Sequence, residues 1–321
     1  MSNKILVTDS LFIKDKHVKK LEDAGFEVER LDVPKATEEE LIGALKGKVG
    51  YIIGGVEKVT DKVFESGADL KAVVFTGTAV YDFVTGHNEA TKKGIAIANA
   101  PYFNAISVAE FGMSMTLLMC RDLIGLARGG NKSFETTKTL ASLKVGILGM
   151  GHVGNEYANM AKGMGVDRLY YFNRTQIKDI EEQKGLIYLE KDELFSTCDL
   201  IFICVAASAG KKFINEDNIN SLKNGSIIIS IAKEELIDME ALQKRLGSSE
   251  LKAAFDEPVH NGSLSSLPLD VLYSPNESSA YNTEQTIEDT SNSAVDSMIN
   301  ILKNGDDNYI VNPEFRKNTK I

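Results

Sequence analysis

Three glycines at fixed spacing carry the strongest chemical signal in the sequence. Gly149, Gly151 and Gly154 form the pattern GxGxxG, between the apolar run KVGIL and the helical pattern NEYANMAKGMG. In a strand-turn-helix unit the first glycine permits a tight turn, the second lets a pyrophosphate approach the backbone, and the third lets the helix pack on the strand. The phosphate rests on the helix N-terminus, beside His152 and Val153. The unit therefore predicts a dinucleotide site, and a purely structural turn is the alternative.

The next predicted strand is followed by Asn173, Arg174 and Thr175. In Rossmann folds that bind NAD, an acidic residue at this position holds the adenosine ribose, and this sequence has none there. A guanidinium pairs with a 2′-phosphate in bidentate fashion, and the neighbouring amide and hydroxyl can donate further hydrogen bonds. The segment therefore favours NADP(H), with NAD(H) as the alternative. The alternative interpretation is that Arg174 is a solvated surface residue and Asn173 a turn residue, in which case the segment does not indicate the form of the cofactor.

These residues lie within two series of alternating strands and helices, which are typical of parallel sheets covered by helices. The apolar runs predict strands in the first series at 4–9, 26–31, 50–53, 72–75 and 95–98, and helices at 14–24, 38–45 and 61–65. One long buried helix is predicted over 107–126 and a closing helix over 287–302. The second series predicts six strands, at 144–149, 168–172, 200–205, 226–231, 251–255 and 271–274. The expected fold class is α/β, with two Rossmann-like, doubly wound parallel-sheet domains and a cleft between them.

The composition of the chain excludes several classes of binding partner. A length of 321 residues fits two domains, and a net charge of -10 without a basic cluster argues against nucleic acid. The three cysteines lie in apolar stretches without metal-ligand spacing, so we expect buried thiols and no metal site. Nowhere do about 18 apolar residues follow one another, so we expect no membrane association and a cytoplasmic location.

With the motif placed, the chain resembles the D-isomer-specific 2-hydroxyacid dehydrogenases, the family of D-lactate and D-3-phosphoglycerate dehydrogenases. The likeness covers nearly every segment. Besides the glycine motif, it rests on short sequences in family order: Asn99-Ala100-Pro101, Ser107-Val108-Ala109-Glu110, Leu236-Ile237-Asp238 with Ala241-Leu242, Ala253-Ala254-Phe255-Asp256, and Ser274-Pro275.

The resemblance implies a discontinuous, flavodoxin-like substrate domain, residues 1–100 with 286–321, and a dinucleotide domain, residues 101–285. It also implies a homodimer through the long helix after Val108. Further cofactor contacts are expected at the ends of the later strands, at Val205, Ala206, Ala232, Asp256 and Ser278.

The resemblance fails at the catalytic positions. Family members use an arginine that binds substrate, a histidine that donates a proton, and a glutamate that orients the histidine. Lys233 stands in the arginine position, Asn276 in the histidine position, and Glu257 directly follows Asp256 in a shortened loop. A desolvated lysine can attract an anionic substrate and transfer a proton. The equal alternative is that Lys233 pairs with a nearby acid such as Glu234.

Other residues could also reach a small anionic substrate. Tyr102 lies where the family places residues near the substrate, or else serves packing. His260 could replace the missing imidazole, although a histidine in a polar loop is usually solvated. Backbone N–H groups at strand ends suit a carboxylate, and such ends are predicted at Gly54, Gly55, Gly77 and Thr78.

Two functions follow from these residues. The first is an NAD(P)(H)-dependent oxidoreductase that transfers hydride between the nicotinamide and a small 2-keto or 2-hydroxy acid, or a related carbonyl or imine. The second is a catalytically silent dinucleotide-binding regulator or scaffold that kept the fold.

Overall fold

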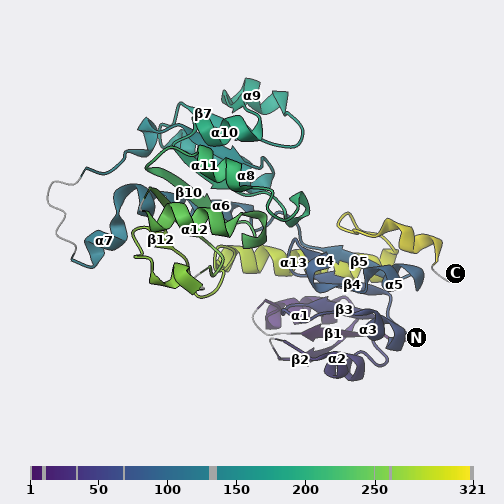
Figure 1. Ribbon diagram of the computed structural model, residues 1–321. Coiled ribbons are helices and arrows are strands. Elements are labelled where there is room, and N and C mark those ends of the chain that lie inside the picture. Colours follow the sequence, from purple (N-terminus) through teal and green to yellow (C-terminus); the bar gives the residue numbers. More distant parts are fainter. Residues whose placement is uncertain are drawn as a thin grey trace. The chain divides into compact units, whose positions relative to one another are not determined.

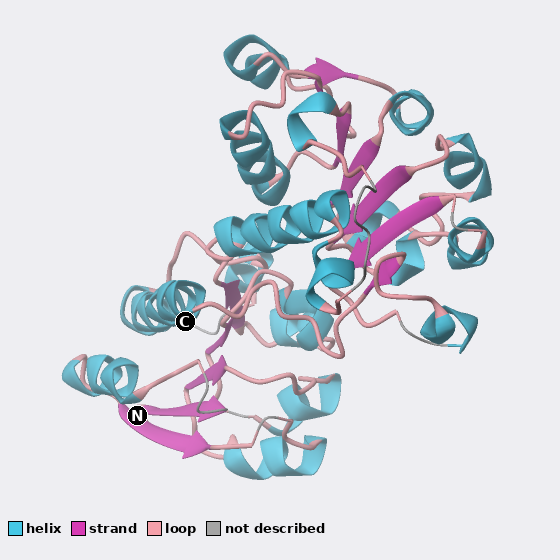
Figure 2. Cartoon of the chain, turned by 90° about the vertical axis from the view of Figure 1, so that its left-hand side faces the viewer, coloured by secondary structure: helices cyan, strands magenta, loops and turns pink. Residues whose placement is uncertain are grey.

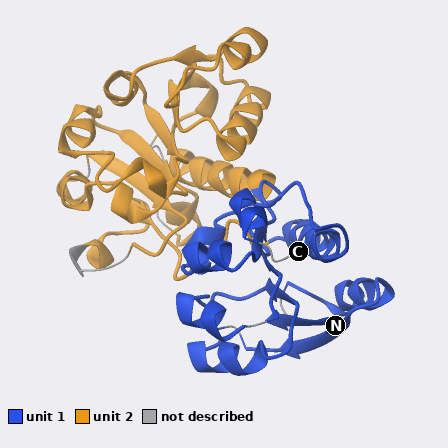
Figure 3. Cartoon of the chain, turned by 90° about the vertical axis from the view of Figure 1, so that its right-hand side faces the viewer, with its two compact units in different colours: residues 1–104, 283–321 blue, residues 105–282 orange. Residues whose placement is uncertain are grey.

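The computed structural model describes residues 2–8, 12–33, 35–67, 69–129, 136–248, 250–259 and 262–318. The chain divides into two compact units, the first formed by Met1–Asn104 with Thr283–Ile321 and the second by Ala105–Asn282 (Figure 3). Each unit contains one parallel sheet with helices (Figure 1). The predicted fold class, two parallel α/β domains, is confirmed.

The sheet of the first unit has the order β2-β1-β3-β4-β5 among the described residues, and all its strands run parallel. This is a doubly wound order in which the direction of winding changes between β1 and β3. The strands are β1 (Lys4–Thr8), β2 (Glu27–Leu31), β3 (Gly50–Ile53), β4 (Ala72–Phe75) and β5 (Ala96–Asn99).

Helices cover both faces of this sheet because alternate residues of its buried strands point to opposite sides. One core joins α1 and α13 to strand residues such as Val7 and Val74, and the other joins α2 and α3 to residues such as Leu6 and Val73. The helices are α1 (Asp15–Asp23), α2 (Glu38–Ala44), α3 (Asp61–Ser66), α4 (Val80–Phe83), α5 (His87–Lys92) and α13 (Glu284–Asn304).

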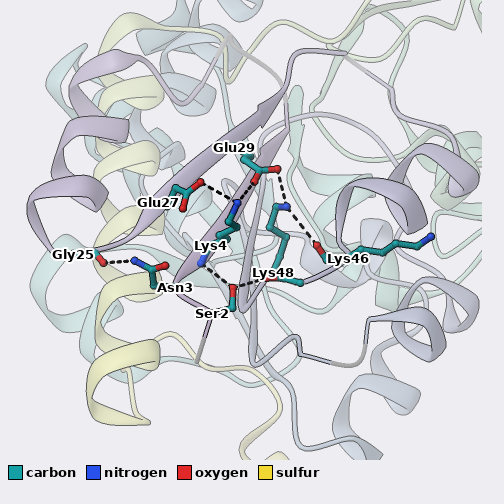
Figure 4. Close-up of polar contacts among 9 residues, drawn as sticks. Ser2, Asn3, Lys4, Gly25, Glu27, Glu29, Lys46 and Lys48 are labelled. Carbon is teal, nitrogen blue, oxygen red and sulfur yellow. Dashed lines mark hydrogen bonds and ion pairs between the residues drawn. The ribbon is translucent and has the colours of Figure 1, made fainter.

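A group of lysines and glutamates fastens β1 to β2 (Figure 4). The Nζ atom of Lys4 lies 3.0 Å from carboxylate oxygens of both Glu27 and Glu29, and the Nζ atom of Lys48 lies 2.7 Å from the other oxygen of Glu29. The hydrogen bond from Lys48 is the main reason why the pKa of Glu29 is lowered. All four charges are paired within the group, so we assign it to the packing of the unit.

The sheet of the second unit has the order β12-β11-β10-β9-β6-β7-β8 in the described part of the chain. The order reverses between β6 and β9, which is the crevice where Rossmann sheets bind dinucleotides. The strands are β6 (Val145–Leu148), β7 (Leu169–Phe172), β8 (Ile187–Tyr188), β9 (Leu200–Ile203), β10 (Ser226–Ser230), β11 (Leu251–Phe255) and β12 (Leu272–Tyr273).

Figure 2 shows helices on both sides of this larger sheet. Residues such as Ile147 and Phe202 face the core built with α6 and α8, whereas Leu148 and Ile203 face the core built with α10, α11 and α12. The helices are α6 (Ala105–Arg121), α7 (Leu123–Ala127), α8 (His152–Gly163), α9 (Lys178–Lys184), α10 (Lys191–Thr197), α11 (Glu216–Ser221) and α12 (Met239–Gly247).

Two predictions about the second unit are wrong. The long helix expected over 107–126 is broken at Asp122, whose φ of 51° is left-handed, so that α6 ends at Arg121 and α7 begins at Leu123. The sheet also contains a seventh strand within the described residues, β8, whose two residues pair with β7. Such a short edge strand depends on its neighbour rather than on its own sequence.

Candidate functional site

The glycine turn lies where the sheet order of the second unit reverses. Gly149 follows β6, and its φ of +104° is accessible to glycine but strained for other residues. A Cβ on Gly149 would stand 3.0 Å from backbone atoms of Cys204 and Val205, which follow β9. The Sγ atom of Cys204 also donates to the carbonyl oxygen of Gly149 at 3.0 Å. The backbones of the two strand ends are therefore in close contact.

The other two glycines of the motif, Gly154 and Gly151, differ in what surrounds them. A Cβ on Gly154 would come closer than 3.0 Å to the carbonyl oxygen of Gly149, so only glycine lets α8 approach β6 this closely. A Cβ on Gly151 would meet no atom within 4 Å. Gly151 is the N-cap of α8, followed by an exposed His152 and a half-buried Val153. This open space at a helix N-terminus fits a pyrophosphate.

A cavity of about 630 Å³ opens beside the turn. It contains seven of the predicted cofactor residues: Gly149, Gly151, Asn173, Arg174, Thr175, Val205 and Ala206. Six further lining residues were not predicted: Met150, Phe172, Cys204, Ser208, Ala209 and Phe213. Most of these lie at strand ends or in the turn after β9, and the carboxyl-end rule for parallel sheets could have identified Phe172 and Cys204.

The segment after β7 presents no carboxylate to this cavity. Arg174 and Thr175 are exposed. The Oδ1 atom of Asn173 accepts from the backbone N–H of Met150 at 3.4 Å, and its Nδ2 atom donates to the carbonyl oxygen of Thr175 at 3.1 Å. The amide of Asn173 therefore ties the segment to the glycine turn, and Arg174 supplies the positive charge at the cavity.

A second group of predicted residues follows the adjacent strands β10 and β11. Lys233 forms an ion pair with Glu257, and the backbone N–H of Glu234 donates to the second oxygen of that carboxylate at 3.0 Å. The side chain of Lys233 is 55% exposed and that of Glu257 is 16% exposed. Lys233 is therefore paired with an acid that follows the neighbouring strand β11.

Asp256 anchors the loop that follows β12. Its buried Oδ1 atom accepts from the backbone N–H groups of Ser279 and Ala280 at 2.9 and 3.0 Å. Burial is the largest cause that raises the pKa of Asp256 above its usual range. The Oγ atom of Ser274 donates to the carbonyl oxygen of Glu257 at 2.8 Å, which fixes the start of the same loop.

The loop itself carries the remaining predicted residues of this unit. Asn276 is exposed and Ser278 is half-buried, while Ala232 is buried at the end of β10. His260 lies outside the described residues. Because β9, β10, β11 and β12 are parallel neighbours, Ala232, Asn276 and Ser278 follow the carboxyl ends of strands at the same edge of the sheet as Val205 and Ala206.

In the first unit the predicted substrate residues follow two adjacent strands. Gly54 and Gly55 are buried after β3, and Gly77 and Thr78 come after β4 with greater exposure. Tyr102 is 53% exposed, and its φ of 75° is unusual for a bulky side chain.

Sequence reasoning missed a buried carboxyl group beside Gly54. Glu57 is fully buried, its Oε1 atom accepts from the hydroxyl of Tyr51 at 2.6 Å and from that of Thr8, and its Oε2 atom has no hydrogen-bond partner. The backbone N–H of Gly54 donates to the Thr8 hydroxyl at 3.4 Å. The signal in the sequence is weak, since a lone glutamate after a strand usually reaches solvent.

Within the described ranges, no group of three or more histidine, cysteine, aspartate or glutamate side chains could hold a metal ion. No helix there is long and apolar enough to cross a bilayer.

Comparison with known proteins places these features in context. Residues 119–275 match the family model described as D-isomer specific 2-hydroxyacid dehydrogenase, NAD binding domain. The chain is 31% identical over 259 residues to a D-3-phosphoglycerate dehydrogenase of Methanocaldococcus jannaschii, which covers 78% of this chain and 48% of that protein. The chain thus spans about half the length of this curated relative.

Two solved structures have a similar fold. An NAD+-bound 3-phosphoglycerate dehydrogenase of Entamoeba histolytica has a TM-score of 0.78 at 22% identity, covering 97% of this chain and 99% of that chain. An acyclic imino acid reductase in complex with NADPH and D-Arg has a TM-score of 0.80 at 19% identity, covering 96% and 99%. At these identities the likeness shows the fold alone.

Proposed function

Because the chain belongs to the D-isomer-specific 2-hydroxyacid dehydrogenase family, we propose that it is an oxidoreductase that uses a nicotinamide dinucleotide. Its substrate in this proposal is a small anionic 2-keto or 2-hydroxy acid, or a related carbonyl or imine. The observation that carries the proposal is the open glycine turn beside the cavity at the reversal of strand order.

We propose NADP(H) as the preferred dinucleotide. Arg174 is exposed at the cavity, and the strand that precedes it ends without an acidic residue that would repel a 2′-phosphate. A guanidinium can pair with phosphate through two hydrogen bonds. One of the structurally similar proteins was solved with NADPH and the other with NAD+, so the fold is compatible with either form.

When bound, the nicotinamide supplies or accepts the hydride, and the chain's own residues handle charge and protons. Lys233 can attract a carboxylate, and it carries a proton that Glu257 holds in place through their ion pair. Asn276 can donate a hydrogen bond from its amide but no proton. In this proposal Lys233 is the acid of the reduction, and Glu257 orients it.

The same ion pair favours a second function. A lysine that is held in an ion pair with Glu257, and an asparagine in the place of the family histidine, also suit a dinucleotide-binding regulator that performs no reduction. Incubation of the protein with NADPH and a panel of 2-keto acids, and of 2-keto acids with ammonia, separates the two. Oxidation of NADPH supports the oxidoreductase, and tight binding without turnover of any compound supports the regulator.

The cofactor preference has a test that needs no substrate. We expect Arg174→Asp to raise the Kd for NADPH by roughly 10- to 100-fold, because hydrogen bonds to charged groups contribute about 1.5–3 kcal/mol. The Kd for NADH should change little. Arg168→Asp, at the opposite end of β7, makes the same change of net charge away from the cavity and should leave both Kd values unaltered. Equal weakening of NADPH and NADH by Arg174→Asp would contradict the assignment.

A further inference from the structure

The hydroxyl of Tyr171 lies in the interior of the second unit and joins two parts of the segment that carries Arg174. Tyr171 is fully buried near the end of β7. Its Oη atom donates to the Oε1 atom of Glu181 at 2.7 Å and accepts from the backbone N–H of Ile177 at 2.8 Å. A buried hydroxyl that both donates and accepts holds its two partners at fixed positions.

Glu181, on α9, receives a second donor from the same segment. The Nε2 atom of Gln176 lies 2.9 and 3.1 Å from the two carboxylate oxygens of Glu181. The hydrogen bond from Tyr171 is the largest cause that lowers the pKa of Glu181, while burial raises the pKa of Tyr171 to about 12. Glu181 is therefore an ionised acceptor and Tyr171 a neutral donor at neutral pH.

The opposite end of the segment is tied to the glycine turn. Asn173 accepts from the backbone of Met150 and donates to the backbone of Thr175. Together with the bonds at Gln176 and Ile177, these contacts fix the backbone on both sides of Arg174. The side chain of Arg174 stays exposed at the cavity.

We propose that Tyr171 and Glu181 are positioning residues that determine the preference for the phosphorylated dinucleotide. They act through the segment 173–177, which they hold so that Arg174 faces the 2′-phosphate. The inference rests on the proposed NADP(H) preference. It concerns specificity because Gly149 and Gly154 are held by contacts with Cys204 and with each other, and the one described bond from the segment to the glycine turn comes from Asn173, which a substitution of Tyr171 or Glu181 does not change. The parts of the cofactor that NADPH and NADH share should therefore bind equally well without the network.

The experiment measures the Kd of NADPH and of NADH for each variant by the fluorescence of the reduced nicotinamide, in a chain that has no tryptophan. We expect Tyr171→Phe to lower the ratio of the NADH Kd to the NADPH Kd by roughly fivefold. This corresponds to the loss of a net hydrogen bond of about 1 kcal/mol. The NADH Kd itself should stay within twofold of the wild-type value.

Tyr188→Phe is the matched control. The ring of Tyr188 packs against that of Tyr171, with 5.4 Å between centroids, but its hydroxyl bonds only to Glu190 among the described contacts. This variant should keep the wild-type ratio. Glu181→Gln retains one acceptor oxygen and should keep most of the preference for NADPH. Glu181→Ala removes both acceptor oxygens and should lose the preference. The Glu181 variants also test the inference if Tyr171→Phe does not fold.

The outcomes separate the inference from the proposal on which it rests. A wild-type protein that binds NADH at least as tightly as NADPH overturns both. A wild-type preference for NADPH that survives in both Tyr171→Phe and Glu181→Ala overturns the positioning role and leaves the cofactor assignment intact. A preference that falls in these two variants while the melting temperature stays near that of Tyr188→Phe supports the inference.

Discussion

Separate alanine substitutions at Gly151 and Gly154 should divide the glycine motif into a binding position and a packing position. A Cβ on Gly151 meets no atom within 4 Å, whereas one on Gly154 comes closer than 3.0 Å to the carbonyl oxygen of Gly149. Each variant adds one methyl group within the same turn. The first methyl group enters the space proposed for the pyrophosphate, and the second pushes α8 away from β6.

For Gly151→Ala we expect a normally folded protein that has lost affinity. The φ of Gly151 is -83°, which alanine adopts freely. The poorer N-cap costs up to about 1 kcal/mol, and the less flexible unfolded chain offsets about 0.4–1 kcal/mol. The free energy of unfolding should therefore change by less than about 1 kcal/mol. The Kd values of NADPH and NADH should rise together by roughly 10-fold or more, because steric overlap with a close contact costs about 1–3 kcal/mol.

For Gly154→Ala the damage should appear in the unliganded protein. The methyl group opposes backbone, which cannot turn aside as a flexible side chain would, so we expect about 1–3 kcal/mol of destabilisation together with weaker binding. Urea unfolding and nicotinamide fluorescence titrations measure the two effects. If Gly151→Ala folds and binds both dinucleotides like the wild type, the pyrophosphate does not lie at residue 151. A Gly154→Ala protein of wild-type stability would show that the packing argument is wrong.

Two further predictions concern the residues after β10 and β11. Asp256→Asn keeps the Oδ1 acceptor, and the raised pKa of Asp256 means that the wild type loses stability as the pH rises through the folded-state pKa. The variant should therefore gain stability relative to the wild type as the pH rises from about 4, the ordinary pKa of an aspartate, through the raised folded-state pKa, and urea unfolding that gives the same difference at every pH would contradict this. Lys233→Met should change the free energy of unfolding by only about 1 kcal/mol, since the side chain of Lys233 is 55% exposed and Glu257 keeps the hydrogen bond from the backbone of Glu234, and it should leave the NADPH Kd unaltered. The rate of NADPH oxidation with an accepted keto acid should fall by roughly 10²–10⁴-fold, and an unchanged rate would remove Lys233 as the acid.

The long buried strands could be predicted from sequence because both faces of a parallel sheet are covered, which makes its strands continuous apolar runs. The run KVGIL and the strand β6 illustrate this. By contrast, β8 has two residues, of which Ile187 is exposed, and only its pairing with β7 makes it a strand. The break at Asp122 could not be predicted from sequence because the residues on both sides of it suit a continuous helix, and neither glycine nor proline marks the break.

The candidate site was predictable where local backbone geometry determines the residue. Glycine is required at position 149 by its positive φ and at position 154 by the close carbonyl oxygen of Gly149, so the spacing of the motif within one turn identifies both. The pair of Lys233 and Glu257 joins residues far apart in the sequence. They meet because β10 and β11 are parallel neighbours in which Ser230 lies beside Phe255. Without that register, the acids adjacent to Lys233 in the sequence were the natural candidates.

Substitutions after β6 and β9 disturb more of the backbone than substitutions after β10 and β11. At β6 and β9 any Cβ on Gly149 or Gly154 meets backbone, so a change there requires the turn and α8 to be rebuilt. At β10 and β11 the side chain of Lys233 is 55% exposed, and Asp256 and Ser274 hold the neighbouring backbone in place through their own hydrogen bonds. An exposed side chain such as that of Lys233 can be exchanged there at little cost to folding. The physics of the fold therefore constrains the dinucleotide cradle tightly while it leaves the groups that handle protons free to differ, so the nature of the acid must be decided by kinetics on variants of Lys233.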